Sequence, residues 1–185
     1  MARPVLHDAV TLNHFGAADR LDVLQGRHAH LAEPRWAKEV RQEVENGVNT
    51  RNPHCQRVLN QVWLGEAHEI LPKDQKAFFR IWIGLNEGRQ PPEAHRGEAE
   101  SIFFAELHDG KFLTDDNGAY DFACKRPLLG IARVIDSIDV LRDAVEFDEI
   151  TAVEASEIAT SMENSDRSLR PLHRGRISSE YFQRK

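Results

Sequence analysis

Short apolar runs alternate with amphipathic stretches along this chain, a pattern typical of strands that alternate with helices. Apolar runs at 3–7, 111–114 and 128–131 predict strands, and 27–31 is a further candidate. Strands separated by helices pair in parallel, because each crossover returns the chain to the same edge of the sheet. The pattern therefore predicts an α/β fold with a short central parallel sheet flanked by helices.

The helices are predicted from apolar residues that recur every three or four positions. They are expected at 9–24 with a break at Gly16, 33–47, 52–86 in two pieces broken at Leu71 and Pro72, 97–107, a stretch ending at Cys124, 133–144 and 148–162. Residues 87–95, rich in Gly, Pro and charge, are predicted to form a loop. The aromatic residues Phe78, Phe79 and Trp82 are interpreted as core rather than as a platform that stacks on bases.

Length and composition indicate one ordinary globular domain. The chain has 185 residues, of which 41% are hydrophobic and 29% are charged. No apolar run approaches the roughly 20 residues that a membrane helix needs, and the N-terminus lacks the apolar segment of an export signal. Its cysteines, Cys55 and Cys124, are too few for a disulfide framework and show no metal-binding spacing. We therefore expect a cytoplasmic protein that does not contact a membrane.

Charge divides the chain unevenly between a body and a tail. The net charge is −6, but the last twenty residues carry +4 and the rest −10. We divide the chain into a domain at 1–162 and a basic C-terminal tail at 163–185. An acidic body repels a phosphate backbone unless its acids bind cations. The tail is consistent with an RNA clamp, a solvated end or a docking segment.

Acidic side chains follow predicted strands or begin a predicted helix, where α/β proteins bind ligands, and one more lies on an amphipathic helix three residues after Val40. These candidates are Asp8, Glu43, Glu98, Glu100, Asp115 and Asp116. Carboxylates that converge repel one another unless a hard dication compensates them. The set therefore predicts a site for Mg²⁺ or Mn²⁺.

Other interpretations of these residues stay open. Asp8 and Asp116 also suit helix caps, Glu98 suits the first turn of a helix, and Glu43 suits a solvated helix face. His28 and His30 form the only close histidine pair, and a zinc site would need such nitrogen ligands.

Several of these segments resemble PIN-domain ribonucleases, the nuclease class that includes many toxins of bacterial toxin–antitoxin pairs. The similarity covers roughly residues 3–135. It is carried by 5–9 with 15–24, by Val40-Arg41-Gln42-Glu43, and most specifically by Gly97-Glu98-Ala99-Glu100 followed by Leu113-Thr114-Asp115-Asp116. The resemblance implies a three-layer α/β/α PIN-like fold, in which 52–86 is a helical insertion or a long helical hairpin.

The resemblance also implies an acidic quartet that binds the metal. The quartet would be Asp8, Glu43, Glu98 and Asp116. Glu100 is the alternative to Glu98, and Asp115 is the alternative to Asp116. Glu98 matches the apolar register of the helix better than Glu100, which lies two residues on and about 200° round the helix. The family often has a hydroxyl residue two positions after the first acid. This chain has Val10 there, so Thr11 or Asn13 would have to replace it.

The implied activity is metal-dependent cleavage of RNA, leaving a 5′-phosphate and a 3′-hydroxyl. The implied partners are an RNA substrate, a small antitoxin protein and a second copy of the chain. His7, His14 and Arg96 lie near the acids in sequence and are candidates for phosphate contact or proton transfer, although packed roles suit them as well. One alternative is a PIN-like module that binds RNA or protein without catalysis. Another is an aspartate-dependent phosphatase with Asp8 as nucleophile, which Val10 disfavours because that class places a second Asp there.

Overall fold

A short parallel sheet lies at the centre of the fold. The computed structural model describes residues 3–30, 35–50, 52–87, 94–165 and 169–183. The strands β1 (Val5–His7), β2 (Lys111–Leu113) and β3 (Val134–Ile135) are hydrogen-bonded in the order β1-β2-β3 and all run parallel. Leu6, Phe112 and Val134 form one buried row across the sheet. The predicted α/β class and parallel sheet are therefore confirmed.

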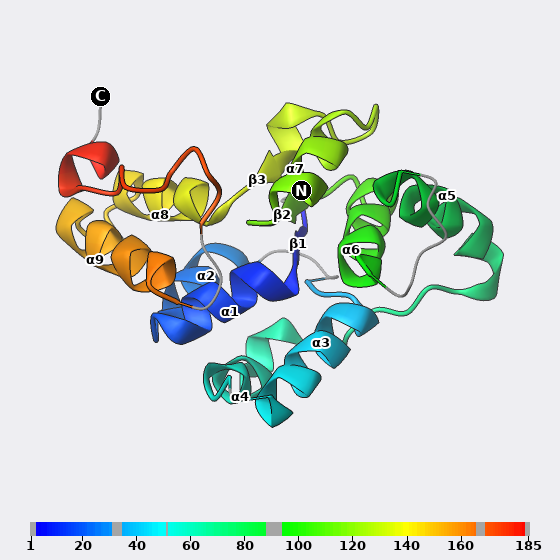
Figure 1. The fold of residues 1–185 in the computed structure, drawn as a ribbon, viewed down its shortest axis with the longest axis horizontal. Helices are drawn as coiled ribbons and strands as arrows, with labels where there is room; N and C mark the ends of the chain where they lie inside the picture. Colours follow the sequence, from blue (N-terminus) through cyan, green and yellow to red (C-terminus); the bar gives the residue numbers. More distant parts are fainter. Residues whose placement is uncertain (1–2, 31–34, 51, 88–93, 166–168, 184–185) are drawn as a thin grey trace.

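Helices lie on both sides of this sheet in Figure 1, with α1, α2, α8 and α9 on one side and α5 and α6 on the other. The α-helices are α1 (Ala9–Ala17), α2 (Leu21–His28), α3 (Lys38–Asn49), α4 (His54–Leu59), α5 (Gln75–Leu85), α6 (Arg96–Leu107), α7 (Asn117–Cys124), α8 (Ser137–Glu146) and α9 (Ala152–Glu163). Short 3-10 turns are η1 (Val62–Leu64), η2 (Pro72–Asp74), η3 (Ile131–Arg133) and η4 (Ser179–Phe182).

Each strand is followed by an aspartate that caps the next helix. Asp8 caps α1, Asp116 caps α7 and Asp136 caps α8, and each side chain accepts a hydrogen bond from a backbone N–H in the first turn. Because the strands are parallel, these three caps all lie beyond the carboxyl ends of the sheet. The same local chemistry that starts the helices therefore gathers carboxylates at one edge.

Two of the predicted strands are wrong. Arg27 and His28 end α2, and Leu31 lies outside the described residues. The run 128–131 forms a turn that leads into η3, with Leu128 60% and Ile131 76% exposed. The strand is instead Val134–Ile135, a segment that the apolar periodicity assigns to a helix. An apolar run favours a strand but does not decide which residues pair, and β2 pairs with the later residues.

The predicted helices needed further correction. Trp36 and Ala37 are extended and bridge to His7 and His68, so α3 begins only at Lys38 and continues past Gly47 to Asn49. Its proposed start at 33–34 lies outside the described residues. The break at Pro72 is correct, but the first piece of 52–86 is only α4 and η1, followed by a non-helical stretch.

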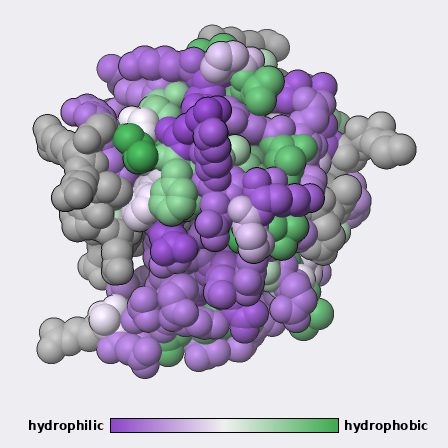
Figure 2. All heavy atoms as spheres, turned by 90° about the vertical axis from the view of Figure 1, so that its right-hand side faces the viewer, coloured by the Kyte–Doolittle hydropathy of each residue, from purple (hydrophilic) through white to green (hydrophobic). Residues whose placement is uncertain are grey.

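The aromatic residues of α5 divide between core and surface. Phe78 is buried, whereas Phe79 is 44% exposed, so the core interpretation holds for the first and not the second. Figure 2 turns this side of the molecule toward the viewer and shows mostly hydrophilic residues with separate hydrophobic groups. Both cysteines are free thiols, as expected. In the described part of the chain, no helix is long and apolar enough to cross a membrane.

The basic C-terminal tail is folded where the structure describes it. Leu169, Ile177 and Phe182 are buried, and η4 packs against α8 and α9. In Figure 1 this red segment lies beside those two helices. The solvated-end interpretation is therefore wrong for residues 169–183.

Candidate functional site

Asp8 is a buried carboxylate at the end of β1. Its side chain is 1% exposed and accepts hydrogen bonds from the Thr11 backbone N–H, at 2.7 Å, and from the Thr114 hydroxyl. Burial raises the pKa of Asp8 to about 7, and the neighbouring charge of Asp115 adds to this, although the hydrogen bonds from Thr114 and Thr11 oppose it. Asp8 therefore holds a proton far more readily than an ordinary aspartate.

Thr114 connects Asp8 to the acids that follow β2. Its hydroxyl donates to Asp8 and accepts a hydrogen bond from the Asp116 backbone N–H at 3.0 Å. Asp116 in turn caps α7 by accepting from the Ala119 N–H at 2.7 Å. Thr114 thus links the side chain of Asp8 to the backbone of Asp116, while the Asp116 carboxylate itself caps α7.

Asp115 has a different environment from Asp116. It is 4% exposed, accepts from His14 Nδ1 at 2.6 Å and from the Ser137 N–H at 3.0 Å, and also accepts from the Ser137 hydroxyl. These contacts join β2 to α1 and α8. Asp115 is therefore a buried connector between elements, whereas Asp116 is only partly buried.

Asp116 and two further carboxylates, Glu98 and Glu43, act on one exposed histidine, His95. The hydrogen bond with Glu98, at 3.5 Å, raises the pKa of His95 above its ordinary value, and the charges of Glu98, Asp116 and Glu43 add to this. Glu43 also lies against the start of α6, because a Cβ atom on Gly97 would be only 2.6 Å from its Oε1. Acids from α3, α6 and the β2–α7 connection thus share one electrostatic environment.

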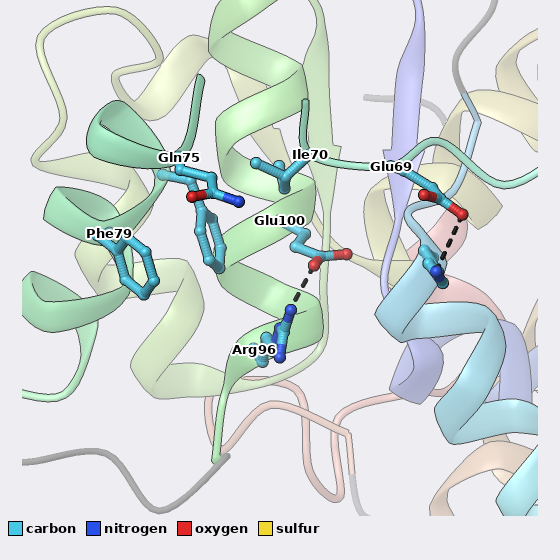
Figure 3. Close-up of a pocket in the computed structure, with 8 residues that line it drawn as sticks. Glu69, Ile70, Gln75, Phe79, Arg96 and Glu100 are labelled. Carbon is cyan, nitrogen blue, oxygen red and sulfur yellow. Dashed lines mark ion pairs between the residues drawn. The ribbon is translucent and has the colours of Figure 1, made fainter. Parts of the chain in front are cut away.

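Glu100 lies apart from this group. It is 3% exposed, accepts from the Glu39 N–H at 3.0 Å, and its Oε1 lies 3.5 Å from Arg96 Nε. Figure 3 shows Glu100 with Arg96 in a pocket that α5 residues such as Phe79 also line. The burial of Glu100 raises its pKa, although the hydrogen bond from Glu39 opposes the shift. Glu100 therefore ties α6 to the start of α3.

The buried histidine pair His7 and His28 was not foreseen. His7 Nδ1 must donate to the Arg35 carbonyl, at 2.9 Å, so its Nε2 accepts from His28 Nδ1, also at 2.9 Å. Burial lowers the pKa of His7 to about 4 and that of His28 well below its ordinary value. The pair joins β1 to the end of α2. No periodicity in the sequence indicates a contact between residues 21 positions apart.

The other nitrogen-bearing candidates pair with acids. His14 is 1% exposed and bonds to Asp115, whereas Arg96 is 43% exposed and forms ion pairs with Glu39 and Glu100. His28 is bonded to His7 rather than paired with His30 for a metal.

The donor set at the strand ends suits a hard dication, because its side-chain ligands are carboxylates. Among the described residues, no Lys, Arg or His forms an ion pair with Asp8, so its charge lacks a cationic partner there. No group of three or more His, Cys, Asp or Glu residues in the described ranges is arranged closely enough to hold an ion. The chemistry of the acids therefore fits Mg²⁺ or Mn²⁺, whereas their spacing is wider than that of a closed metal cluster.

Comparison of the chain with protein-family models, with curated proteins and with solved structures finds no match.

Proposed function

We propose that this chain is a PIN-domain endoribonuclease with a three-layer α/β/α arrangement, which cleaves RNA with the help of Mg²⁺ or Mn²⁺. The main support is the convergence of acids from distant segments. Thr114 joins Asp8 to Asp116, while Asp116, Glu43 and Glu98 all act on His95. Helix capping accounts for Asp8 and Asp116, whereas it does not account for Glu43 and Glu98, which act on the same histidine as Asp116.

In this proposal Asp8, Glu43, Glu98 and Asp116 would hold the metal, which requires their side chains to draw closer than in this structure, where no three such acids of the described residues form a cluster. When bound, the ion supplies a water poised for attack on the phosphodiester and offsets charge on the departing oxygen. Thr114 holds the carboxylate of Asp8 in one orientation by donating to it. The Thr11 backbone N–H also donates to Asp8, and the Thr11 hydroxyl would have to take the place of the hydroxyl residue that the family often carries one position earlier.

His95 has a separate role in this scheme. Its ring is 43% exposed, and the surrounding carboxylates favour its protonated form. A cationic imidazole at the opening of an acidic site attracts a phosphate of the RNA backbone. The acid excess of residues 1–162 then no longer argues against RNA binding. Some of these acids would bind the cation, whose positive charge attracts the RNA backbone.

The experiment is cleavage of single-stranded RNA by the purified chain with Mn²⁺ or Mg²⁺. We expect Asp116→Asn and Glu43→Gln to reduce the cleavage rate by about a hundredfold or more, because each removes a metal ligand. The matched controls are Asp121→Asn on α7 and Glu45→Gln on α3, which change neighbouring acids outside the site and should cleave at the wild-type rate.

Equal rates in all four variants and the wild type would contradict the assignment of the acids. The products should carry a 5′-phosphate and a 3′-hydroxyl, as the PIN resemblance implies. The roles as a toxin, with a small antitoxin as partner, and as a homodimer are further parts of the proposal, which co-purification with a neighbouring small protein and the molecular mass in solution would test.

A second candidate is a PIN-like module that binds RNA or protein without cleaving it. The wide spacing of the acids among the described residues favours it. It predicts RNA binding that does not change when Mn²⁺ is added and no cleavage by the wild type. The phosphatase alternative gains no support, because position 10 is Val rather than the second Asp of that class.

A further inference from the structure

The C-terminal segment inserts two nitrogen-bearing side chains, Arg170 and His173, at the start of α8. Arg170 and His173 both bond to the same oxygen of Asp136, at 2.9 Å and 2.8 Å. All three residues are at least nine-tenths buried. Burial alone would raise the pKa of Asp136, but the hydrogen bonds and charges of His173 and Arg170 hold it below its ordinary value. The contact is therefore a buried cluster around Asp136 rather than a surface ion pair, and Arg170 Nε is buried there without a hydrogen-bond partner among the described residues.

Arg170 also touches the helix that Asp116 begins. Its guanidinium carbon lies 3.4 Å from the ring centre of Tyr120 on α7, close enough for a strong cation–π contact. Asp116, which caps α7, is four residues before Tyr120. Arg170 thus contacts the helix that Asp116, a proposed metal ligand, caps.

Asp136, the partner of Arg170, is also connected to the loop 114–116, through α8. Asp136 caps α8, and the next residue, Ser137, donates two hydrogen bonds to Asp115. Asp115 is adjacent to Asp116. One arginine from the C-terminal segment therefore fastens together the first turns of α7 and α8, between which the loop 114–116 is held.

A second set of contacts keeps the segment in place. His173 Nδ1 lies 2.9 Å from the Tyr181 hydroxyl, and Arg142 of α8 lies over the Tyr181 ring at 4.2 Å. The basic residues of the tail that are buried are thus used within the protein. Arg176, by contrast, is exposed.

We propose that Arg170 is a positioning residue for the candidate site, which fixes Asp116 through α7 and α8 and does not contact RNA. The part of this inference that concerns catalysis rests on the proposed nuclease function. The part that concerns the loop 114–116 stands independently of it, because the contacts lie within the protein.

The test compares Arg170→Met with Arg176→Met in the full-length chain. Hydrogen exchange measured by mass spectrometry should show faster exchange at 114–120 in Arg170→Met and no change in Arg176→Met. These residues include the Ala119 amide that bonds to Asp116. In RNA cleavage, Arg170→Met should lower kcat by about tenfold or more, because small displacements of catalytic groups have effects of this size. KM for RNA and its salt dependence should stay within about twofold of the wild type, since no phosphate contact is lost.

Two more variants keep the test decisive if Arg170→Met does not fold. Tyr120→Leu removes the ring beneath the guanidinium without leaving a buried charge unpaired, and it should produce the same exchange change and the same fall in kcat. Arg170→Lys keeps the charge beside Asp136 and should restore part of kcat.

Unchanged exchange at 114–120 in both Arg170→Met and Tyr120→Leu would overturn the proposal. A rise in KM and a weaker salt dependence with unchanged kcat would also overturn it, because they would assign Arg170 to RNA contact. If the wild type cleaves no RNA, the nuclease proposal fails, while the exchange data still decide whether Arg170 holds the loop.

Discussion

At the scale of single residues, Asp8 shows a conflict between stability and the proposed chemistry. Its pKa is raised from 3.8 to about 7, so the folded state binds this proton more tightly than the unfolded state does. The raised pKa lowers the stability of the folded state. This loss of stability is absent below about pH 4 and grows as the pH rises toward 7, where the buried carboxylate must ionise. A residue that served only as a helix cap would gain nothing from this arrangement.

We therefore expect Asp8→Asn to stabilise the protein at pH 8. The amide still caps α1 but carries no buried charge, so the free energy of unfolding should rise by roughly 1 to 4 kcal/mol. The difference should shrink toward zero at pH 4. Urea denaturation with a chelator at both values measures it, with exposed Asp121→Asn as the control. A variant less stable than the wild type at pH 8 would contradict this account of Asp8.

Gly97 offers a second test at this scale. A methyl group there meets the end of the flexible Glu43 side chain at 2.6 Å, so Glu43 must move. Gly97→Ala should keep the stability within about 1 kcal/mol, because alanine favours the helix, yet it should lower RNA cleavage. Gly26→Ala on α2 is the matched control, since its new Cβ meets only Glu149 at an ordinary 3.7 Å. Wild-type cleavage by Gly97→Ala would argue against a role for Glu43.

At the scale of elements, α6 separates two glutamates by function although they are two residues apart. Glu98 faces the acids around His95, whereas Glu100 accepts the Glu39 N–H at the start of α3. Glu100→Ala should therefore lower the free energy of unfolding by about 1 to 3 kcal/mol by leaving a backbone donor without its partner.

Glu98→Ala should leave stability almost unchanged, within about 0.5 kcal/mol, but should reduce RNA cleavage. Urea denaturation and the cleavage assay, applied to both variants, measure the contrast. If the two variants lost stability and activity in equal proportion, α6 would not divide these roles between its faces.

At the scale of the whole molecule, the C-terminal segment is part of the folded unit. A truncation after Met162 would remove the buried residues Leu169, Ile177 and Phe182, so it would alter stability as well as any RNA contact. Phe182→Ala is a sharper change and should cost about 3 kcal/mol or more, because it leaves a cavity against α9.

Leu172→Ala is the matched control from the same segment, since its side chain is 47% exposed. It should cost less than about 1 kcal/mol. Thermal or urea unfolding distinguishes the two. Similar small losses in both variants would mean that the segment adds little to the stability of the molecule.

Local patterns in the sequence were sufficient to indicate the class of fold and most helices. The strand before Asp8, the strand before Thr114 and the caps that follow them depend on residues close in the chain, so their signals are local. The six candidate acids could be named for the same reason. The run 128–131 misled, because an apolar run carries no information about which residues a neighbouring strand will pair with.

The choice among those acids depended on contacts between residues far apart in the chain. Asp115 and Asp116 differ because His14, 101 positions earlier, and Ser137, 22 positions later, bond to the first and not to the second. The inward position of Arg170 depends likewise on Asp136 and Tyr120. Local composition thus settles which residues can carry charge and begin helices, whereas burial and long-range pairing settle what each charge is used for.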